Sequence, residues 1–186
     1  MKTNLFPAIK LTAVTLVFFA GVYTAIIWGV AQFSPNQGSG EIITQNGKKY
    51  YANVGQTFTE DKYFNSRPSA VGYNAAGSGG SNKGPSNPEY LAAVQARIDT
   101  FLVHNPEVKK QDIPVELVTA SGSGLDPDIS ADAALVQLKR IAKTRNISES
   151  NLKQLIDQHT ESPLLGMLGP SKINVLKLNM ALDGIK

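Results

Sequence analysis

Cysteine is absent from this chain of 186 residues, which also has only two histidines, His104 and His159, and a single tryptophan. The absence of cysteine excludes disulfides, thiol nucleophiles, iron–sulfur clusters and cysteine zinc sites. Two histidines leave little material for a metal centre or a proton relay. We therefore predict no metal site, no catalytic residue and no firmly bound cofactor in this chain.

A strong charge of either sign is also lacking. Lysine and arginine number 18 and aspartate and glutamate 15, a formal net charge of +3. Lys2 and Lys10 come before a long apolar run, so the residues after that run carry 16 positive and 15 negative groups. Such a weak field does not attract nucleic acid, and we expect no nucleic-acid partner. With 42% apolar and 18% charged residues, the composition is typical of a folded domain.

One long run of the sequence has no formal charge: residues 11–31, LTAVTLVFFAGVYTAIIWGVA. As a helix it would be about 31 Å long, the thickness of the hydrocarbon core of a bilayer. The alternative is a cleaved signal peptide, because Gly29-Val30-Ala31 places small residues at cleavage positions. The run is longer than the usual signal core of about 7–15 residues, and bulky Trp28 lies beside that site. We therefore predict a retained transmembrane helix embedded in the lipid bilayer.

The lysines predict the orientation of this helix. Lys2 and Lys10 precede it, whereas the next charge after it is Glu41. Because positive flanks stay in the cytoplasm, we expect residues 1–10 to be cytoplasmic, residues 32–40 to form a linker and residues 41–186 to form an outer domain. In a bacterium this is a single-pass protein of the inner (plasma) membrane with a periplasmic domain.

Small residues recur every four positions on the predicted helix, at Gly21, Ala25 and Gly29. Such a pattern lets another helix approach closely. It also arises by chance in membrane helices, so docking and simple anchoring both remain open.

The outer domain begins with strand signals. Residues 42–44 and 48–53 flank Gln45-Asn46-Gly47, and Asn-Gly is a strong hairpin signal. Residues 58–64 are expected to continue as a strand or a short helix, and residues 70–86, rich in glycine and serine, as a surface loop.

Helix signals dominate the later sequence. Asn87-Pro88 opens one helix, Ser130 begins a second that Asn146 ends, Ser148 begins a third and Ser171 a fourth. A helical stripe predicts that Leu135 is buried, and residues 113–119 read as a strand. The predicted fold class is α+β: one N-terminal transmembrane helix, then a single extracytoplasmic domain with a small sheet packed by helices.

Residues 119–130, TASGSGLDPDIS, form the most suggestive polar stretch. It resembles an anion-binding loop, but no G-x-x-x-x-G-K-[ST] motif accompanies it. It also imitates a calcium loop, yet Ala131 and Gln137 stand where glycine and glutamate are required. Both histidines fall at predicted helix ends, which is a structural role. Arg67, held extended by the following proline, is expected to clamp a partner carboxylate or its own backbone.

Several long motifs resemble one known family. They are YFNSRPSA (residues 63–70), SNKGPSNPEYLAAVQAR (81–97), TASGSGLDPDIS (119–130) and LGMLGPSKINVLKLNMALD (165–183). Together with the N-terminal membrane helix, they resemble the C subunit of the bacterial Kdp potassium-transporting ATPase. The resemblance covers nearly the whole chain.

The resemblance implies a non-catalytic subunit of a high-affinity potassium pump. In that family a channel-like A subunit carries potassium, a P-type B subunit hydrolyses ATP, and a small F subunit lies in the membrane. The C subunit is described as an assembly factor and catalytic chaperone that raises the affinity of the pump for ATP, and as a cap over the potassium entrance. ATP and potassium are thus handled by the complex, and a glycine-rich region has been linked to nucleotide.

The predicted topology conflicts with direct ATP contact, because an outer domain cannot reach a cytoplasmic nucleotide pocket. We therefore expect coupling through the membrane helices. The residues expected at the partner interface come from the family-like motifs: Arg67, Pro68, Ser69, Asn82, Gly84, Pro85, Ser86, Ser121, Gly122, Ser123, Gly124 and Asp126.

Two alternatives from other classes stay open at this point. One is a membrane-anchored periplasmic hydrolase that pairs Ser121 or Ser123 with a histidine. The other is a stand-alone, membrane-anchored binding module. Asp126, Asp128 and Asp132 also suggest that the outer domain places carboxylates near entering cations.

Overall fold

The structure is a computed structural model that describes residues 2–34, 36–45 and 47–185. It divides into two units, Met1–Tyr51 and Ala52–Lys186. Asn46, the centre of the predicted hairpin turn, lies outside the described residues, and so does Pro35 in the predicted linker. The predicted boundary of the outer domain at residue 41 stays a prediction.

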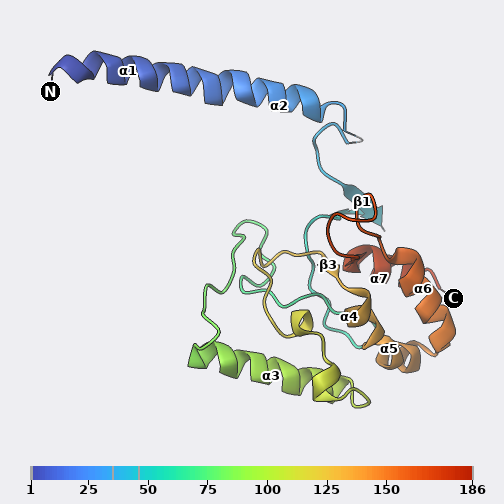
Figure 1. The fold of residues 1–186 in the computed structure, drawn as a ribbon. Helices are drawn as coiled ribbons and strands as arrows, with labels where there is room; N and C mark the ends of the chain where they lie inside the picture. Colours follow the sequence, from blue (N-terminus) through green and yellow to red (C-terminus); the bar gives the residue numbers. More distant parts are fainter. Residues whose placement is uncertain (1, 35, 46, 186) are drawn as a thin grey trace. The chain divides into compact units, whose positions relative to one another are not determined.

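The first unit begins with a continuous helix (Figure 1). It consists of α1 (Lys2–Leu16), the π-helical turn η1 (Val17–Tyr23) and α2 (Thr24–Ala31). Within it, Asn4–Ala31 is long and apolar enough to cross a membrane, by length and composition. The prediction of one N-terminal apolar helix is confirmed, and this helix starts well before residue 11.

The π-helical turn in the middle of this helix is a feature that the sequence analysis missed. The Thr24 hydroxyl donates to the carbonyl of Phe19, five residues earlier, at 2.9 Å. A π-helix takes more residues per turn than the 3.6 of an α-helix. The helix is therefore wound more loosely between Val17 and Tyr23 than on either side.

The predicted hairpin is also present. Strands β1 (Ile42–Gln45) and β2 (Lys48–Tyr51) pair antiparallel, with Ile42 opposite Tyr51. The second strand ends two residues before the predicted Asn53. The next residue, Ala52, is buried in the second unit, where its carbonyl accepts a hydrogen bond from the Asn174 side chain at 2.7 Å.

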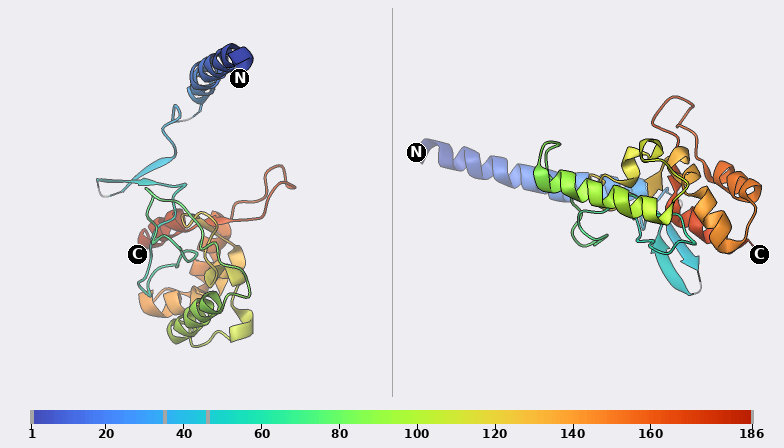
Figure 2. Two further views of the ribbon diagram at one scale, coloured as in Figure 1. Left: turned by 90° about the vertical axis from the view of Figure 1, so that its left-hand side faces the viewer. Right: turned by 90° about the horizontal axis from the view of Figure 1, so that it is seen from below.

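The second unit packs helices on a very small sheet. Strands β3 (Asp128–Ile129) and β4 (Ile173–Asn174) pair antiparallel. Around them lie α4 (Ala131–Leu135), α5 (Leu138–Arg145), α6 (Glu149–His159) and α7 (Val175–Asp183). The orange and red helices lie together in both views of Figure 2. This arrangement confirms the α+β class with one apolar helix in front.

The caps of several helices are as predicted. Asn87 accepts from the Tyr90 amide at the start of α3 (Pro88–His104), and Ser130 and Ser148 cap α4 and α6. Asn146 ends α5 in the left-handed conformation, with φ of 55°. In contrast to α4–α7, α3 has no buried residue and lies at the edge of the unit (Figure 1).

The prediction of a strand or helix at residues 58–64 is wrong. The backbone of this segment bonds to side chains rather than to a neighbouring strand. Asn179 accepts from the Phe64 amide and donates to the Phe64 carbonyl, both at 2.9 Å, and Gln137 accepts from the Asn65 amide at 2.8 Å. These buried amides hold Phe64 in the core as an irregular segment.

The predicted strand at residues 113–119 is also wrong. One short 3-10 turn, η3 (Val115–Leu117), stands there, and another, η2 (Lys110–Asp112), directly precedes the segment. Pro114 fixes the bend, its carbonyl accepts from the Leu117 amide at 3.0 Å, and the Thr119 amide bonds to Val115 at 2.9 Å. Local bonds therefore satisfy the backbone, and no ladder is needed.

Two helix boundaries need correction. The helix expected from Ser130 to Asn146 is broken between α4 and α5, where the buried Gln137 side chain donates back to the Ala133 carbonyl. Leu135 beside the break is 37% exposed, not buried as predicted. The last helix begins at Val175 instead of Ser171, because the preceding residues pair as β4.

Candidate functional site

Two loops of the second unit lie against one another. The first loop is residues 66–86 and the second is residues 119–127. The Ser121 amide donates to the Pro68 carbonyl at 3.0 Å, and the Gly79 amide donates to the Ser123 carbonyl at 2.8 Å. The Ser78 hydroxyl reaches the same carbonyl at 2.9 Å. The structure thus brings together two family-like motifs that are about fifty residues apart.

An ion pair joins the same two loops. Arg67 Nη1 lies 2.7 Å from Asp126 Oδ2, and these side chains are only 25% and 29% exposed. The second carboxylate oxygen of Asp126 accepts from the Asp128 amide at 3.1 Å. Arg67 thus binds a carboxylate of its own chain, which was not among the alternatives that the sequence offered, and its role at a partner interface stays a prediction. Within the described part of the chain its Nε is buried without a hydrogen-bond partner.

The start of the first loop folds around Ser69. Its hydroxyl oxygen accepts from the amides of Val71 and Tyr73, at 3.2 and 2.9 Å. The Tyr73 hydroxyl donates to the Arg67 carbonyl at 2.6 Å, and burial raises the pKa of Tyr73. The protonated phenol therefore fixes the backbone that carries Arg67.

Gly124 is the tightest point between the two loops. Its φ is +68°, and a Cβ built there would lie 2.5 Å from Val71 Cγ2 and 2.8 Å from the Gly79 carbonyl oxygen. Gly122, two residues earlier, has nothing within 4 Å of such a Cβ and is exposed. Gly124 is thus required by the loop packing, whereas the position of Gly122 has room for a side chain while its carbonyl lies close to Gly80.

The remaining predicted residues of the first loop have a different setting. Asn82, Gly84, Pro85 and Ser86 lead into α3 rather than toward the second loop. The Asn87 amide donates to the Gly84 carbonyl at 3.1 Å. Lys83, between them, bonds to Glu89 at 2.6 Å and thereby holds the pKa of that carboxyl below its usual range. These residues shape the start of a helix.

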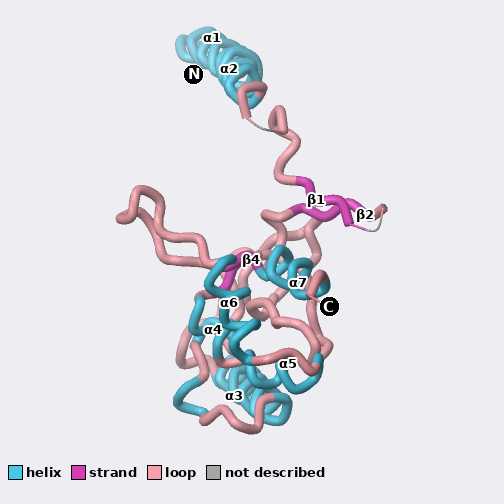
Figure 3. The backbone as a smooth tube through the Cα atoms, turned by 90° about the vertical axis from the view of Figure 1, so that its right-hand side faces the viewer, coloured by secondary structure: helices cyan, strands magenta, loops and turns pink. Residues whose placement is uncertain are grey.

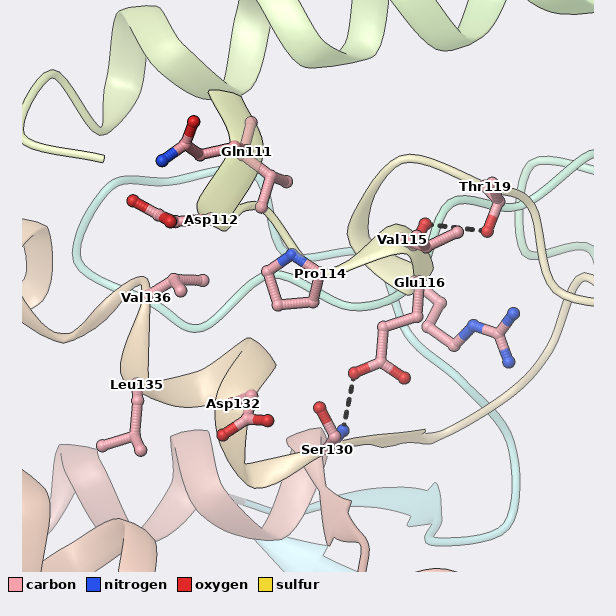
Figure 4. A pocket seen from close by; sticks show the side chains of 12 residues that line it. Gln111, Asp112, Pro114, Val115, Glu116, Thr119, Ser130, Asp132, Leu135 and Val136 are labelled. Atoms are coloured by element: carbon pink, nitrogen blue, oxygen red, sulfur yellow. Dashed lines mark hydrogen bonds between the residues drawn. The ribbon is translucent and has the colours of Figure 1, made fainter. Parts of the chain in front are cut away.

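A cavity of about 770 Å³ adjoins the ion pair, with Arg67 among its lining residues. Figure 4 shows that its walls come from the 3-10 turns and from α4, with Glu116 accepting from the Ser130 amide at 2.9 Å. Asp112 and Asp132 add two further carboxylates. Neither Asp112, directly before the predicted strand, nor Glu116, within it, was expected at a site, because both lie at turns that were not predicted. Pro114 was the signal that this segment bends.

The end of the second loop and the residue after it carry carboxylates that have cationic partners. Asp128 lies 2.8 Å from Lys172 Nζ, and this hydrogen bond raises the pKa of Lys172. Asp126 is held by Arg67. In residues 2–34, 36–45 and 47–185, no group of three or more His, Cys, Asp or Glu residues is placed to hold a metal ion. The idea that Asp126, Asp128 and Asp132 act as a free set near entering cations therefore loses two of its members.

Both histidines lie at helix ends and make polar contacts with groups of their own chain. His104, at the end of α3, places Nδ1 2.8 Å from Asp61, and His159, at the end of α6, places Nδ1 2.9 Å from the Leu155 carbonyl. The Ser123 hydroxyl oxygen accepts from the Leu125 amide at 3.1 Å. These contacts do not form the serine–histidine pair that the hydrolase alternative requires.

The small residues of the N-terminal helix were predicted to pack against another helix. A Cβ built at Gly21 or Gly29 meets nothing within 4 Å, and Ala25 is exposed. Their packing role stays a prediction.

Comparison with known proteins gives a consistent result. A family model described as "K+-transporting ATPase, c chain" matches residues 5–184. The potassium-transporting ATPase KdpC subunit of Bacteroides fragilis is 54% identical over 190 residues, which covers 100% of this chain and 99% of that protein. The subunit of the same name from Flavobacterium johnsoniae is 55% identical over 184 residues, covering 98% and 99%.

A more distant relative shows the same extent of match. The KdpC subunit of Caldanaerobacter subterraneus is 44% identical over 176 residues, covering 94% of this chain and 91% of that protein. Because the family model and the relatives each span nearly the whole sequence, the chain belongs to the KdpC family of K+-transporting ATPase subunits.

Proposed function

We propose that this chain is an accessory, non-catalytic subunit of a K+-transporting ATPase complex and acts by contact with other subunits. The names of its relatives support membership of such a complex. The resemblance implies three partners, a channel-like A subunit, a P-type B subunit and a small F subunit. ATP and potassium are then bound by those partners.

The packing of the two loops is the single observation that carries the proposal. The Arg67–Asp126 pair and the tight fit at Gly124 hold the loops in one arrangement before any partner binds. Gly122 and Ser123 at the turn of the second loop remain exposed. A surface that is ordered before binding suits protein recognition, because little conformational entropy is lost on binding.

The N-terminal helix is the proposed membrane anchor. Lys10 precedes its apolar run and Glu41 follows it. The positive-inside rule then puts the amino terminus in the cytoplasm and the second unit on the outer side of the bacterial inner membrane. A protease added to intact spheroplasts is expected to digest the C-terminal unit. Digestion only after the membrane is permeabilised would contradict this orientation.

With this orientation, any effect on ATP is indirect. An outer unit changes the ATP affinity of the pump by stabilising one conformation of the membrane subunits, and the coupling is reciprocal. A subunit that raises the ATP affinity of the pump in this way, without binding ATP, acts as a catalytic chaperone. A cap over the potassium entrance would then act by its shape and not by attracting potassium. Two of the carboxylates considered for that role, Asp126 and Asp128, are already paired with basic side chains.

Assembly of the complex tests the proposal. We expect the ATPase purified in mild detergent to contain this chain, and deletion of the chain to lower the yield of intact complex. Arg67→Ala, which frees the first loop from Asp126, is expected to lower that yield, whereas Lys153→Ala on the exposed face of α6 is not. An intact and fully active complex from the deletion strain would overturn the proposal.

A further inference from the structure

The hairpin between α6 and β4 carries an exposed apolar tip (residues 164–168). Four of its five residues have large aliphatic side chains: Leu164, Leu165, Met167 and Leu168, which are 68%, 79%, 81% and 58% exposed. In Figure 3 the hairpin extends as a pink loop away from the helices of its unit, and the left view of Figure 2 shows the same orange-red loop. Burial in this unit therefore does not explain these side chains.

The hairpin is nevertheless well ordered by its backbone. Leu164 and Leu168 exchange two backbone hydrogen bonds, at 3.0 and 2.9 Å. Glu161 and Lys172 exchange two more at the base, at 2.8 and 3.1 Å. The chain then continues into β4, where Ile173 is completely buried. The tip is thus presented on a stem that is fixed to the core.

The conformation at the tip costs free energy. Leu165 has φ of +55°, in the left-handed region that favours glycine and asparagine. Such a bulky residue in this region is strained and, here, 79% exposed to water. Neither property helps the unit to fold. A side chain that is strained and exposed in the isolated chain is typical of a contact made with another molecule.

The composition of the hairpin distinguishes between possible binding partners. Residues 162–171, SPLLGMLGPS, contain no charged and no aromatic side chain. Segments that rest on lipid usually combine cations with Trp or Tyr at the interface. Contact with a second copy of this chain through the tip alone would involve residues 164–168 on each side, whereas a stable interface uses about 20–30 residues a side. Leu and Met side chains on a convex tip fit a concave apolar pocket of a different protein.

The base of the hairpin is linked to the residues that follow the second loop. Lys172 at the base of the hairpin binds Asp128, and β4 pairs with β3 directly after the second loop.

We propose that residues 164–168 form a docking peg that inserts into an apolar pocket on another subunit of the ATPase complex. This inference rests on the proposed function, because it takes its partner from that complex. The side chains of Leu165 and Met167, the most exposed of the four, are its central contacts.

Crosslinking identifies what surrounds the tip. A photo-crosslinking amino acid at position 167 in the full chain, within the assembled complex, is expected to form an adduct with one other protein subunit. The same amino acid at Val103, 77% exposed on α3, is the matched control and is expected to give less of that adduct. Adducts with lipid alone, or with a second copy of this chain, would overturn the proposal.

Substitution separates binding from folding. Leu165→Asn suits the left-handed backbone, so we expect an unchanged or higher urea midpoint for the variant chain. Combined with Met167→Ser, it is expected to lower recovery of the complex by tenfold or more, whereas Val103→Ser leaves recovery unchanged. If as much complex is recovered with the double variant as with the wild-type chain, the docking peg is refuted, whereas the proposed function is not. Failure of the wild-type chain to co-purify with any subunit would refute the proposed function as well.

Discussion

Replacing Gly124 with alanine tests whether the two loops are held by close packing. The added Cβ would lie 2.5 Å from Val71 Cγ2 and 2.8 Å from the Gly79 carbonyl oxygen, and the φ of +68° is unfavourable for alanine. The left-handed conformation costs about 1–2 kcal/mol, and overpacking adds about 1–3 kcal/mol. We therefore expect the free energy of unfolding to fall by about 2–5 kcal/mol.

Gly122→Ala is the matched control. It adds the same methyl group to the same loop, at a position with nothing within 4 Å and without a positive φ. The free energy of unfolding is expected to change by no more than about 0.5 kcal/mol. The contrast between two glycines that are two residues apart removes effects of helix propensity and of general hydrophobicity.

The assay is urea denaturation of the full chain in detergent, with the midpoint and the slope both recorded. Hydrogen exchange at the Gly79 amide, which bonds to Ser123, reports on the loop contact itself. We expect faster exchange there in Gly124→Ala and wild-type exchange in Gly122→Ala. Equal midpoints for the two variants would refute the packing argument.

Three further outcomes are expected. Asn179→Ala leaves the buried amide and carbonyl of Phe64 unpaired, so the free energy of unfolding should drop by about 2–4 kcal/mol in urea titrations; a drop below 1 kcal/mol would contradict this. A double-mutant cycle of Arg67→Ala and Asp126→Ala should give a coupling of about 1 kcal/mol, since the pair is partly solvated; purely additive effects would show that it does not join the loops. Burial raises the pKa of Tyr73, which favours the neutral phenol in the folded state. The resulting stability is complete below the unfolded pKa of about 10 and is lost as pH rises through the folded pKa, and Tyr73→Phe should reduce this alkaline loss in unfolding measured from pH 8 to 12.

Local signals in the sequence predicted the parts of the fold that local interactions decide. Asn87, Ser130 and Ser148 each accept a hydrogen bond from the first turn of a helix, and such caps depend only on neighbouring residues. The same holds for the left-handed Asn146 and for the run of apolar residues in the N-terminal helix.

The segments that were predicted wrongly depend on partners far along the chain. The backbone around Phe64 bonds to Asn179, more than one hundred residues later, and no local pattern shows that contact. Gln137 breaks the expected long helix because its side chain also serves Asn65. Long-range side-chain hydrogen bonds of this kind override helix and strand propensity.

The candidate site was predictable in its residues but not in its geometry. The motifs at residues 63–70 and 119–130 were identified from the resemblance, whereas the pairing of Arg67 with Asp126 follows only from the folded loops. The exposed tip was part of a motif expected to lead into a helix. In the structure β4 stands between the tip and α7, so the tip belongs to a hairpin and not to the start of a helix.

The dependence of ATP hydrolysis on this chain tests the central claim most directly. Potassium-stimulated ATPase activity would be measured on complexes purified with and without the chain, over a range of ATP concentrations. The account predicts a higher apparent KM for ATP without the chain, and recovery of the lower value when the full chain is added back. An identical KM and identical potassium stimulation in both preparations would contradict it.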